Sequence, residues 1–133
     1  MEEENISNTF EYFNPSPSGA KVGDCVIRAL CKALNKSWED VYVELCVQGF
    51  IMHDLPNSDP IWGAYLLSQG FKRFIIPDTC PYCYTMTDFA KDHPKGIYIL
   101  GTGSHAVAIQ DGVIYDSWNS GNEVPIFYFT REE

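Results

Sequence analysis

The sequence predicts an α+β domain in which N-terminal helices pack on a C-terminal antiparallel β-sheet. Helical periodicity of apolar residues fills residues 24–70, and short strand-like apolar runs fill most of residues 71–133. The character of the chain changes once, and its 133 residues, 45% of them hydrophobic, are enough for one core. We therefore expect a single domain over residues 1–133, with residues 1–23 as an irregular lead-in because they contain the turn-rich run "NPSPSG".

The first expected helix follows this lead-in. Asp24 can serve as its N-cap, since a short polar side chain accepts well from the first turn of a helix. One face of the helix is apolar. Its members are Val26, Leu30, Ala33 and Leu34.

Two further helices are expected in "SWEDVYVELCVQGF" and "DPIWGAYLLSQGF". Ser37 can cap the first of them, and Gly49 can end it. In the second, Asp59 can cap, Pro60 suits the first turn and Gly70 suits the stop. The helical part thus runs to residue 70.

The remaining part of the chain predicts strands and one short helix. "KRFIIP" has the composition of a strand, and "YTMTDFAKDHPKG" that of a short helix bounded by Pro94 and Gly96. Strand-like runs follow, separated by Gly, Asp and Asn: "GIYILG", "HAVAIQ", "VIYDSW" and "VPIFYFT". Helices first and strands last favour an antiparallel sheet.

Two of these runs form a predicted hairpin. Asp111-Gly112 between apolar segments is typical of a two-residue turn. The resulting register places His105 and Asp116 on one face as diagonal neighbours, because residues two apart share a face. Two interpretations stay open: a structural His–Asp hydrogen bond at the rim of the sheet, or an imidazole held by a carboxylate as a general base requires.

Cys25 opens the first expected helix. The N–H groups and positive dipole end of a helix N-terminus stabilise a thiolate, so this cysteine stands where activation is possible. Cys31 and Cys46 lie inside helices and have the positions of packing residues. A structural role for Cys25 is the alternative, but cysteine, histidine and aspartate together favour nucleophilic chemistry.

The segments "GDCVIRAL", "GSHAVAI" and "YDSW" resemble the papain-like cysteine peptidase superfamily, in particular its compact bacterial and phage members such as the C39-like bacteriocin-processing peptidases. The resemblance covers roughly residues 23–118 by order and type of element. It implies a papain-like fold and a peptide or protein substrate. It also implies that Cys25 is the nucleophile, His105 the general base and acid, and Asp116 the residue that orients the histidine, with a thioester intermediate.

The sequence departs from that family at one position. The family usually places a glutamine six residues before the nucleophile to donate to the oxyanion, and here that position is Gly19. The backbone N–H of Cys25 can supply one donor, and Asn14 is the candidate for the second. Because of this departure, a catalytically inactive binding module is the alternative function.

A second cysteine motif carries another alternative. "CPYC" holds Cys80 and Cys83, as in a glutaredoxin active site, and a single C-x-x-C can also be half of a zinc site. The strand series that follows does not fit the glutaredoxin topology, and no second C-x-x-C completes four zinc ligands. We therefore expect a loop cysteine pair without a role, or a disulfide under oxidising conditions, and predict no metal and no cofactor.

Charge and composition limit the remaining function classes. The net charge of −9 disfavours binding to nucleic acid, because a phosphate backbone would be repelled. No apolar run is long enough to span a bilayer, and the acidic start "MEEEN" is unlike a signal peptide. Five cysteines without a disulfide-framework spacing favour a cytoplasmic location.

Overall fold

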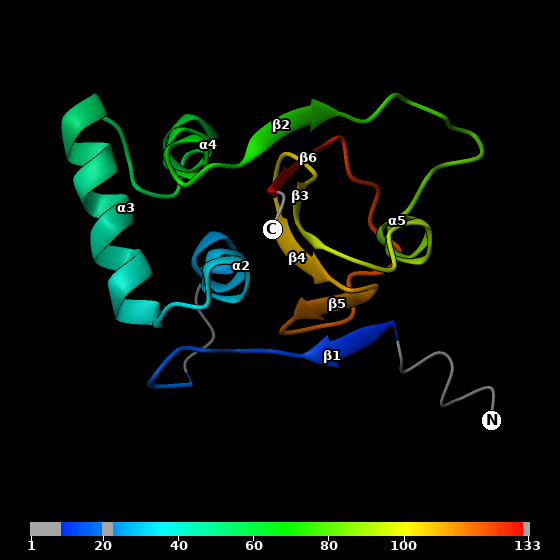
Figure 1. Cartoon of the computed structure of the whole chain (residues 1–133), viewed down its shortest axis with the longest axis horizontal. Helices are drawn as coiled ribbons and strands as arrows, with labels where there is room; N and C mark the ends of the chain where they lie inside the picture. The colour runs from blue at the N-terminus through cyan, green and yellow to red at the C-terminus, as the bar shows by residue number, and fades with distance from the viewer. Residues whose placement is uncertain (1–8, 20–22, 132–133) are drawn as a thin grey trace.

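The computed structural model of the chain describes residues 9–19 and 23–131 (Figure 1). It contains four helices and a six-stranded sheet, so the α+β prediction is confirmed. The helices are α2 (Cys25–Leu34), α3 (Trp38–Met52), α4 (Asp59–Ser68) and α5 (Met86–Asp92). The strands are β1 (Phe10–Tyr12), β2 (Lys72–Ile75), β3 (Ile97–Gly101), β4 (Ala106–Gln110), β5 (Val113–Asp116) and β6 (Phe127–Arg131).

The sheet is mixed, which corrects the expectation of an antiparallel sheet. Its strand order is β1-β5-β4-β3-β6-β2, and β1 runs parallel to β5 at one edge while the other pairings are antiparallel. The lead-in over residues 1–23, expected to be irregular, therefore contains a strand. Three residues are too few to show a period of two, so the sequence of β1 carries no strand signal.

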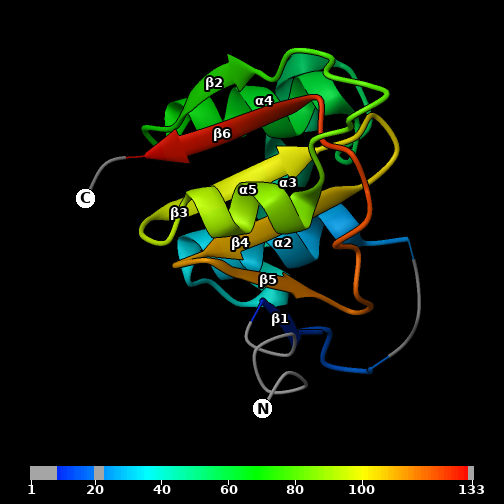
Figure 2. The same cartoon turned by 90° about the vertical axis from the view of Figure 1, so that its right-hand side faces the viewer.

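Helices cover both faces of the sheet. Figures 1 and 2 show α2, α3 and α4 on one face and α5 on the other. Alternation along β3 and β4 serves both sides, since Ile99 and Ala108 join the core under α2–α4 whereas Leu100 and Val107 join the core under α5. Such alternation lets a single sheet build two apolar layers.

The predicted ends of the helices are partly wrong. Asp24 occupies the N-cap position of α2, but its side chain makes no capping hydrogen bond. Gly49 does not end α3, which continues to Met52 and closes with His53 in the left-handed conformation at φ 60°. Gly49 is required for a different reason, because a Cβ there would lie 2.6 Å from the carbonyl oxygen of Asp54.

The limits of α4 follow the sequence more closely. Ser58, rather than Asp59, is the N-cap residue, and the carboxylate of Asp59 instead accepts a 3.0 Å hydrogen bond from Nε1 of Trp62. The helix ends at Ser68, and Gly70 turns the chain away at φ +92° as expected of a stop glycine.

The predicted hairpin is confirmed in turn and register. Asp111 and Gly112 have φ values of 52° and 79°, as a type I′ turn requires. Ile109 pairs with Ile114, and Gln110 pairs with Val113. This register fixes the relative position of the first residues of β4 and the last residues of β5.

The C-x-x-C motif lies in the loop between β2 and α5, where Cys80 and Cys83 form a disulfide. No helix within residues 9–19 and 23–131 combines the length and apolar character that crossing a bilayer demands.

Candidate active site

Three elements meet at one end of the sheet. Cys25 is the first residue of α2, His105 immediately precedes β4, and Asp116 is the last residue of β5. The hairpin brings the start of β4 beside the end of β5, and α2 packs on β4 and β5. Residues far apart in the sequence therefore contribute to one site.

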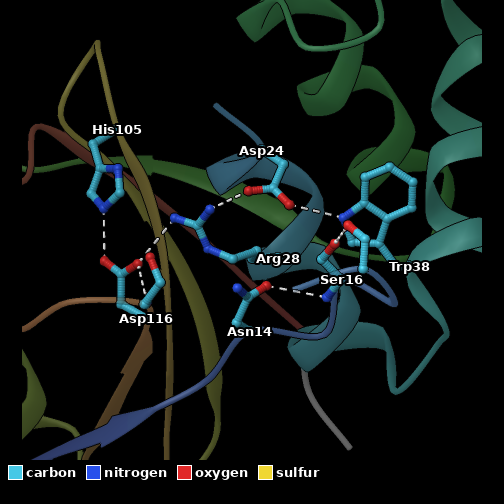
Figure 3. Close-up of polar contacts among 9 residues, drawn as sticks. Asn14, Ser16, Asp24, Arg28, Trp38, His105 and Asp116 are labelled. Carbon is cyan, nitrogen blue, oxygen red and sulfur yellow. Dashed lines mark hydrogen bonds and ion pairs between the residues drawn. The ribbon is translucent and has the colours of Figure 1, made fainter. Parts of the chain in front are cut away.

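His105 and Asp116 are joined directly. Nε2 of His105 lies 2.7 Å from Oδ2 of Asp116 (Figure 3). This bond fixes the orientation of the ring and leaves Nδ1 as the ring nitrogen available to another partner. The indole of Trp118 flanks the imidazole, with ring centroids 5.1 Å apart.

Asp116 is buried, with only 2% of its surface exposed, and its carboxylate accepts several hydrogen bonds. Besides His105, it accepts from Oγ of Ser120 at 2.7 Å and from the backbone N–H of Ser117 at 2.7 Å. A guanidinium N–H of Arg28 approaches its Oδ1 at 3.2 Å. Burial raises the pKa of Asp116, but the bonds from His105 and Ser120 outweigh it, so the pKa lies below its usual value.

Arg28 links this carboxylate to a second one. Its guanidinium donates to Asp116 on one side and to Asp24 on the other, and Asp24 also accepts a 2.9 Å bond from Nε1 of Trp38 (Figure 3). The chain His105–Asp116–Arg28–Asp24–Trp38 therefore crosses from the sheet to α3. Sequence reasoning did not assign Arg28 to the site, although its spacing of four residues from Asp24 on a helix is a signal for an ion pair.

The thiol of Cys25 interacts with the same imidazole. Burial raises its pKa, but a hydrogen bond to the His105 ring, one to the backbone of Ala106, and the charges of His105 and Arg28 bring the net pKa below its ordinary value. Cys31, six residues further along the same helix, behaves oppositely, because burial and the charges of Asp24 and Glu39 raise its pKa to about 12. The two thiols differ in their neighbours, and of the two only Cys25 has a pKa below the ordinary value.

The pKa of His105 is raised to about 9. Burial lowers it, whereas the bonds and charges of Asp116 and Cys25 raise it. The raised imidazole pKa and the lowered thiol pKa both shift the pair toward thiolate and imidazolium. Such a pair is the reactive form of a cysteine nucleophile.

Cys25 and His105 open into a shared cavity of about 220 Å³, which we call the central cleft. Its polar lining includes Asn57, Asp59 and Ser104, and Trp62 and Phe127 supply apolar walls. The cleft gives an external carbonyl compound access to the sulfur.

Asn14, the predicted second oxyanion donor, is not among the described residues that line this cleft. Its Oδ1 accepts a 3.1 Å hydrogen bond from the backbone N–H of Ser16 (Figure 3). Gly19 has a left-handed φ of 68°, and among the described residues no atom lies within 4 Å of the position that a Cβ would take. The role of Asn14 stays a prediction, and Asn57 is the amide side chain that the cleft contains.

The described part of the chain contains no group of three or more His, Cys, Asp or Glu side chains arranged to hold a metal ion. Comparison with protein-family models, with curated proteins and with solved structures found no match. The function is therefore argued from the chemistry of the site.

Proposed function

We propose that the protein is a cysteine hydrolase of papain-like fold that cleaves a peptide or related amide bond through Cys25, His105 and Asp116. One observation carries the proposal: the His105 ring bonds Asp116 through Nε2 and interacts with the Cys25 thiol in the same cleft. A fixed imidazole between a carboxylate and a thiol is the arrangement that activates a cysteine.

The reaction has two halves. The Cys25 thiolate attacks the carbonyl carbon, a C–S bond forms, and the electron pair of the C=O bond moves to oxygen. His105 then gives its proton to the leaving nitrogen as the C–N bond breaks, which leaves a thioester. Water attacks the thioester while His105 takes its proton, and the C–S bond breaks with its electron pair going to sulfur, which releases the acid and restores the thiolate–imidazolium pair.

The developing oxyanion needs hydrogen-bond donors. The first N–H groups of a helix have no partner within the helix, so the start of α2 offers donors and a positive dipole end beside Cys25. Two side-chain amides are candidates for a further donor: Asn57, which lines the cleft, and Asn14 in the lead-in. Loss of one oxyanion donor typically costs on the order of a hundred-fold or more in rate.

The pH dependence of Cys25 alkylation tests the activated thiol. Iodoacetamide labelling, mapped to individual cysteines by mass spectrometry, is measured across a pH series. We expect Cys25 to react at pH values below the titration of an ordinary thiol, and the rate to fall as the pH drops through its lowered pKa. In His105→Ala we expect labelling at neutral pH to slow by roughly ten-fold or more, because the imidazolium no longer stabilises the thiolate.

His53→Asn is the matched control, since His53 is exposed and adopts a left-handed φ that asparagine tolerates. Its Cys25 labelling should equal that of the wild type. Labelling of Cys25 that follows an ordinary thiol and ignores His105→Ala would end the proposal.

A binding module that has lost catalysis is the second candidate. Gly19 stands where the resembled family has its oxyanion glutamine, and Asn14 does not line the central cleft. Turnover of quenched fluorescent peptides that disappears in Cys25→Ala would eliminate this candidate. An activated thiol without turnover of any peptide would favour it.

A further inference from the structure

Two mainly apolar pockets adjoin the central cleft. The first, which we call the Tyr42 pocket, has a volume of about 240 Å³ and shares Gly23 and Asn57 with the cleft. The second, the Leu67 pocket, has a volume of about 380 Å³ and shares Asp59 and Phe127 with the cleft. The two outer pockets share no lining residue with each other, so the cleft with Cys25 and His105 lies between them, and we call the row of three hollows the groove.

The Tyr42 pocket is built by α2, α3 and the loop before α4. Its walls are mainly Ile27, Trp38, Leu45 and Pro56, and the Tyr42 ring stacks on Trp38 with centroids 5.2 Å apart. Nε1 of Trp38 is satisfied by Asp24, so the indole presents its apolar face without an unpaired donor. This pocket suits a large apolar side chain.

The Leu67 pocket lies between α4 and the edge of the sheet. Its lining includes Gly63, Ala64, Leu67 and the ring of Phe129. The guanidinium of Arg73 stacks over Phe127, 4.6 Å from the ring centroid, and borders the pocket. The small residues Gly63 and Ala64 leave the volume that a second apolar side chain would fill.

Lining chemistry differs along the groove. The outer pockets are lined mainly by apolar residues, although Asp24 and Asn57 border the Tyr42 pocket and Asp59 and Arg73 border the Leu67 pocket. The central cleft has the more polar lining, because Asn57, Asp59 and Ser104 lie there together with His105. A polypeptide in extended conformation has the same distribution, with polar amides along its backbone and side chains at intervals. A sugar or a short polar amide would leave both apolar pockets filled with water.

We propose that the groove binds an extended polypeptide segment that places one large apolar side chain in the Tyr42 pocket and another in the Leu67 pocket, on opposite sides of Cys25. The inference rests on the proposed function for the statement that the central amide is the one cleaved. The occupant would be an internal segment of a polypeptide, because chain must continue on both sides of the sulfur.

Binding is tested without chemistry. The Cys25→Ala variant of the full chain is used to select from a random linear peptide library, and affinities of the selected peptides are measured by fluorescence anisotropy. We expect two enriched apolar positions separated by a tolerant spacer. Replacement of either apolar residue by serine should weaken binding by about ten-fold or more, because a serine loses the burial of a large apolar side chain in its pocket.

Introducing a lysine into one pocket at a time shows which pocket holds which apolar residue of the peptide. In the Cys25→Ala background, Tyr42→Lys should change the preference at one peptide position from apolar to Asp or Glu, and Leu67→Lys should do so at the other. Val43→Lys is the matched control, because Val43 is exposed on α3 beside Tyr42 and does not line the pocket. Unchanged thermal unfolding identifies variants that retain the fold.

The outcomes separate this inference from the proposed function. No binding peptide, a single apolar position, or equal effects of Tyr42→Lys and Val43→Lys would overturn the two-pocket groove, whatever the alkylation of Cys25 shows. Conversely, if the selected peptides share two apolar positions but Cys25 reacts as an ordinary thiol, the peptide-binding groove is supported and the proposed hydrolase activity is refuted.

Discussion

Asp116 lies at the centre of the site, and its two carboxylate oxygens have different side-chain partners. His105 and Ser120 bond one carboxylate oxygen, and Arg28 bonds the other. Because Arg28 also binds Asp24, the buried guanidinium holds two carboxylates in place. Arg28 therefore acts as a positioning residue: it fixes the acid that fixes the imidazole.

Arg28→Met is expected to lower the free energy of unfolding by about 3–5 kcal/mol, because it leaves Asp24 buried without its cation and removes one of the two cationic partners of Asp116. Urea unfolding measures the loss. Arg28→Met/Asp24→Asn should recover part of it, since asparagine removes one unpaired charge and can still accept from Trp38.

Lys36→Met is the matched control for the arginine. Lys36 pairs with Glu44 at 2.8 Å, and both side chains are about one-third exposed, at 32% and 36%. Exposed pairs contribute about 0–1 kcal/mol, so this variant should unfold almost as the wild type does. Equal losses for the two variants would contradict the buried role of Arg28.

At the residue scale, sequence reasoning found the members of the site that have distinctive chemistry. Cys25 was found from its place at a helix start, and His105 and Asp116 from the hairpin register. Ser120 was missed, because no periodic or motif signal ties a loop serine to a carboxylate four residues earlier. Asn57 was missed because it approaches the cleft only through the packing of α4 on the rest of the fold.

At the element scale, prediction succeeded where turn and capping chemistry is strong and local. The Asp111-Gly112 turn set the register of β4 and β5, and Gly70 marked the end of α4 closely. Prediction failed for β1, whose pairing with β5 depends on a contact between distant segments. It also failed for Gly49, where a glycine serves close packing rather than a stop.

Gly49→Ala should therefore destabilise the protein, even though alanine is the better helix former. Its Cβ would lie 2.6 Å from the carbonyl oxygen of Asp54, so the loop after α3 must shift. We expect a loss of about 1–3 kcal/mol in the free energy of unfolding, the usual range for overpacking.

Gly63→Ala in α4 provides the comparison. There the nearest atom to a new Cβ is in the Phe129 ring at 3.4 Å, an ordinary contact. Alanine should stabilise this helix by up to about 1 kcal/mol. If Gly49→Ala also stabilised the protein, the close approach of Asp54 would be refuted.

At the scale of the whole molecule, the site depends on how two parts of the fold meet. The sulfur comes with α2, which packs in the layer of α2–α4, and the imidazole and carboxylate come with the central strands (Figures 1 and 2). Sequence order could predict that these groups belong together, but the pockets flanking them arise only from the packing of α3 and α4. The groove was therefore beyond sequence reasoning.

The pH dependence of the free energy of unfolding should reveal the charge state of the Cys25–His105 pair. Between pH 6.5 and about 9, the unfolded chain has a neutral imidazole and a protonated thiol. A native thiolate–imidazolium pair binds the same number of protons, so the two shifts cancel and the pair adds no slope to stability against pH.

Cys25→Ala removes that cancellation. The bond to Asp116 still raises the pKa of His105, so the native state binds one more proton than the unfolded state. The stabilisation is fully present below pH 6.5 and is lost as the pH rises toward the folded pKa of the imidazole, with a slope of at most about 1.4 kcal/mol per pH unit. Urea unfolding across this range, relative to the wild type, measures it.

Two variants isolate the source of that slope. Cys46→Ala removes a half-buried free thiol elsewhere and should leave the wild-type dependence unchanged. Adding Asp116→Asn to Cys25→Ala should abolish the new slope, because the neutral amide no longer favours the imidazolium. If Cys25→Ala instead retained the wild-type dependence, the native histidine would be neutral across this range, and the thiol facing it would carry its proton.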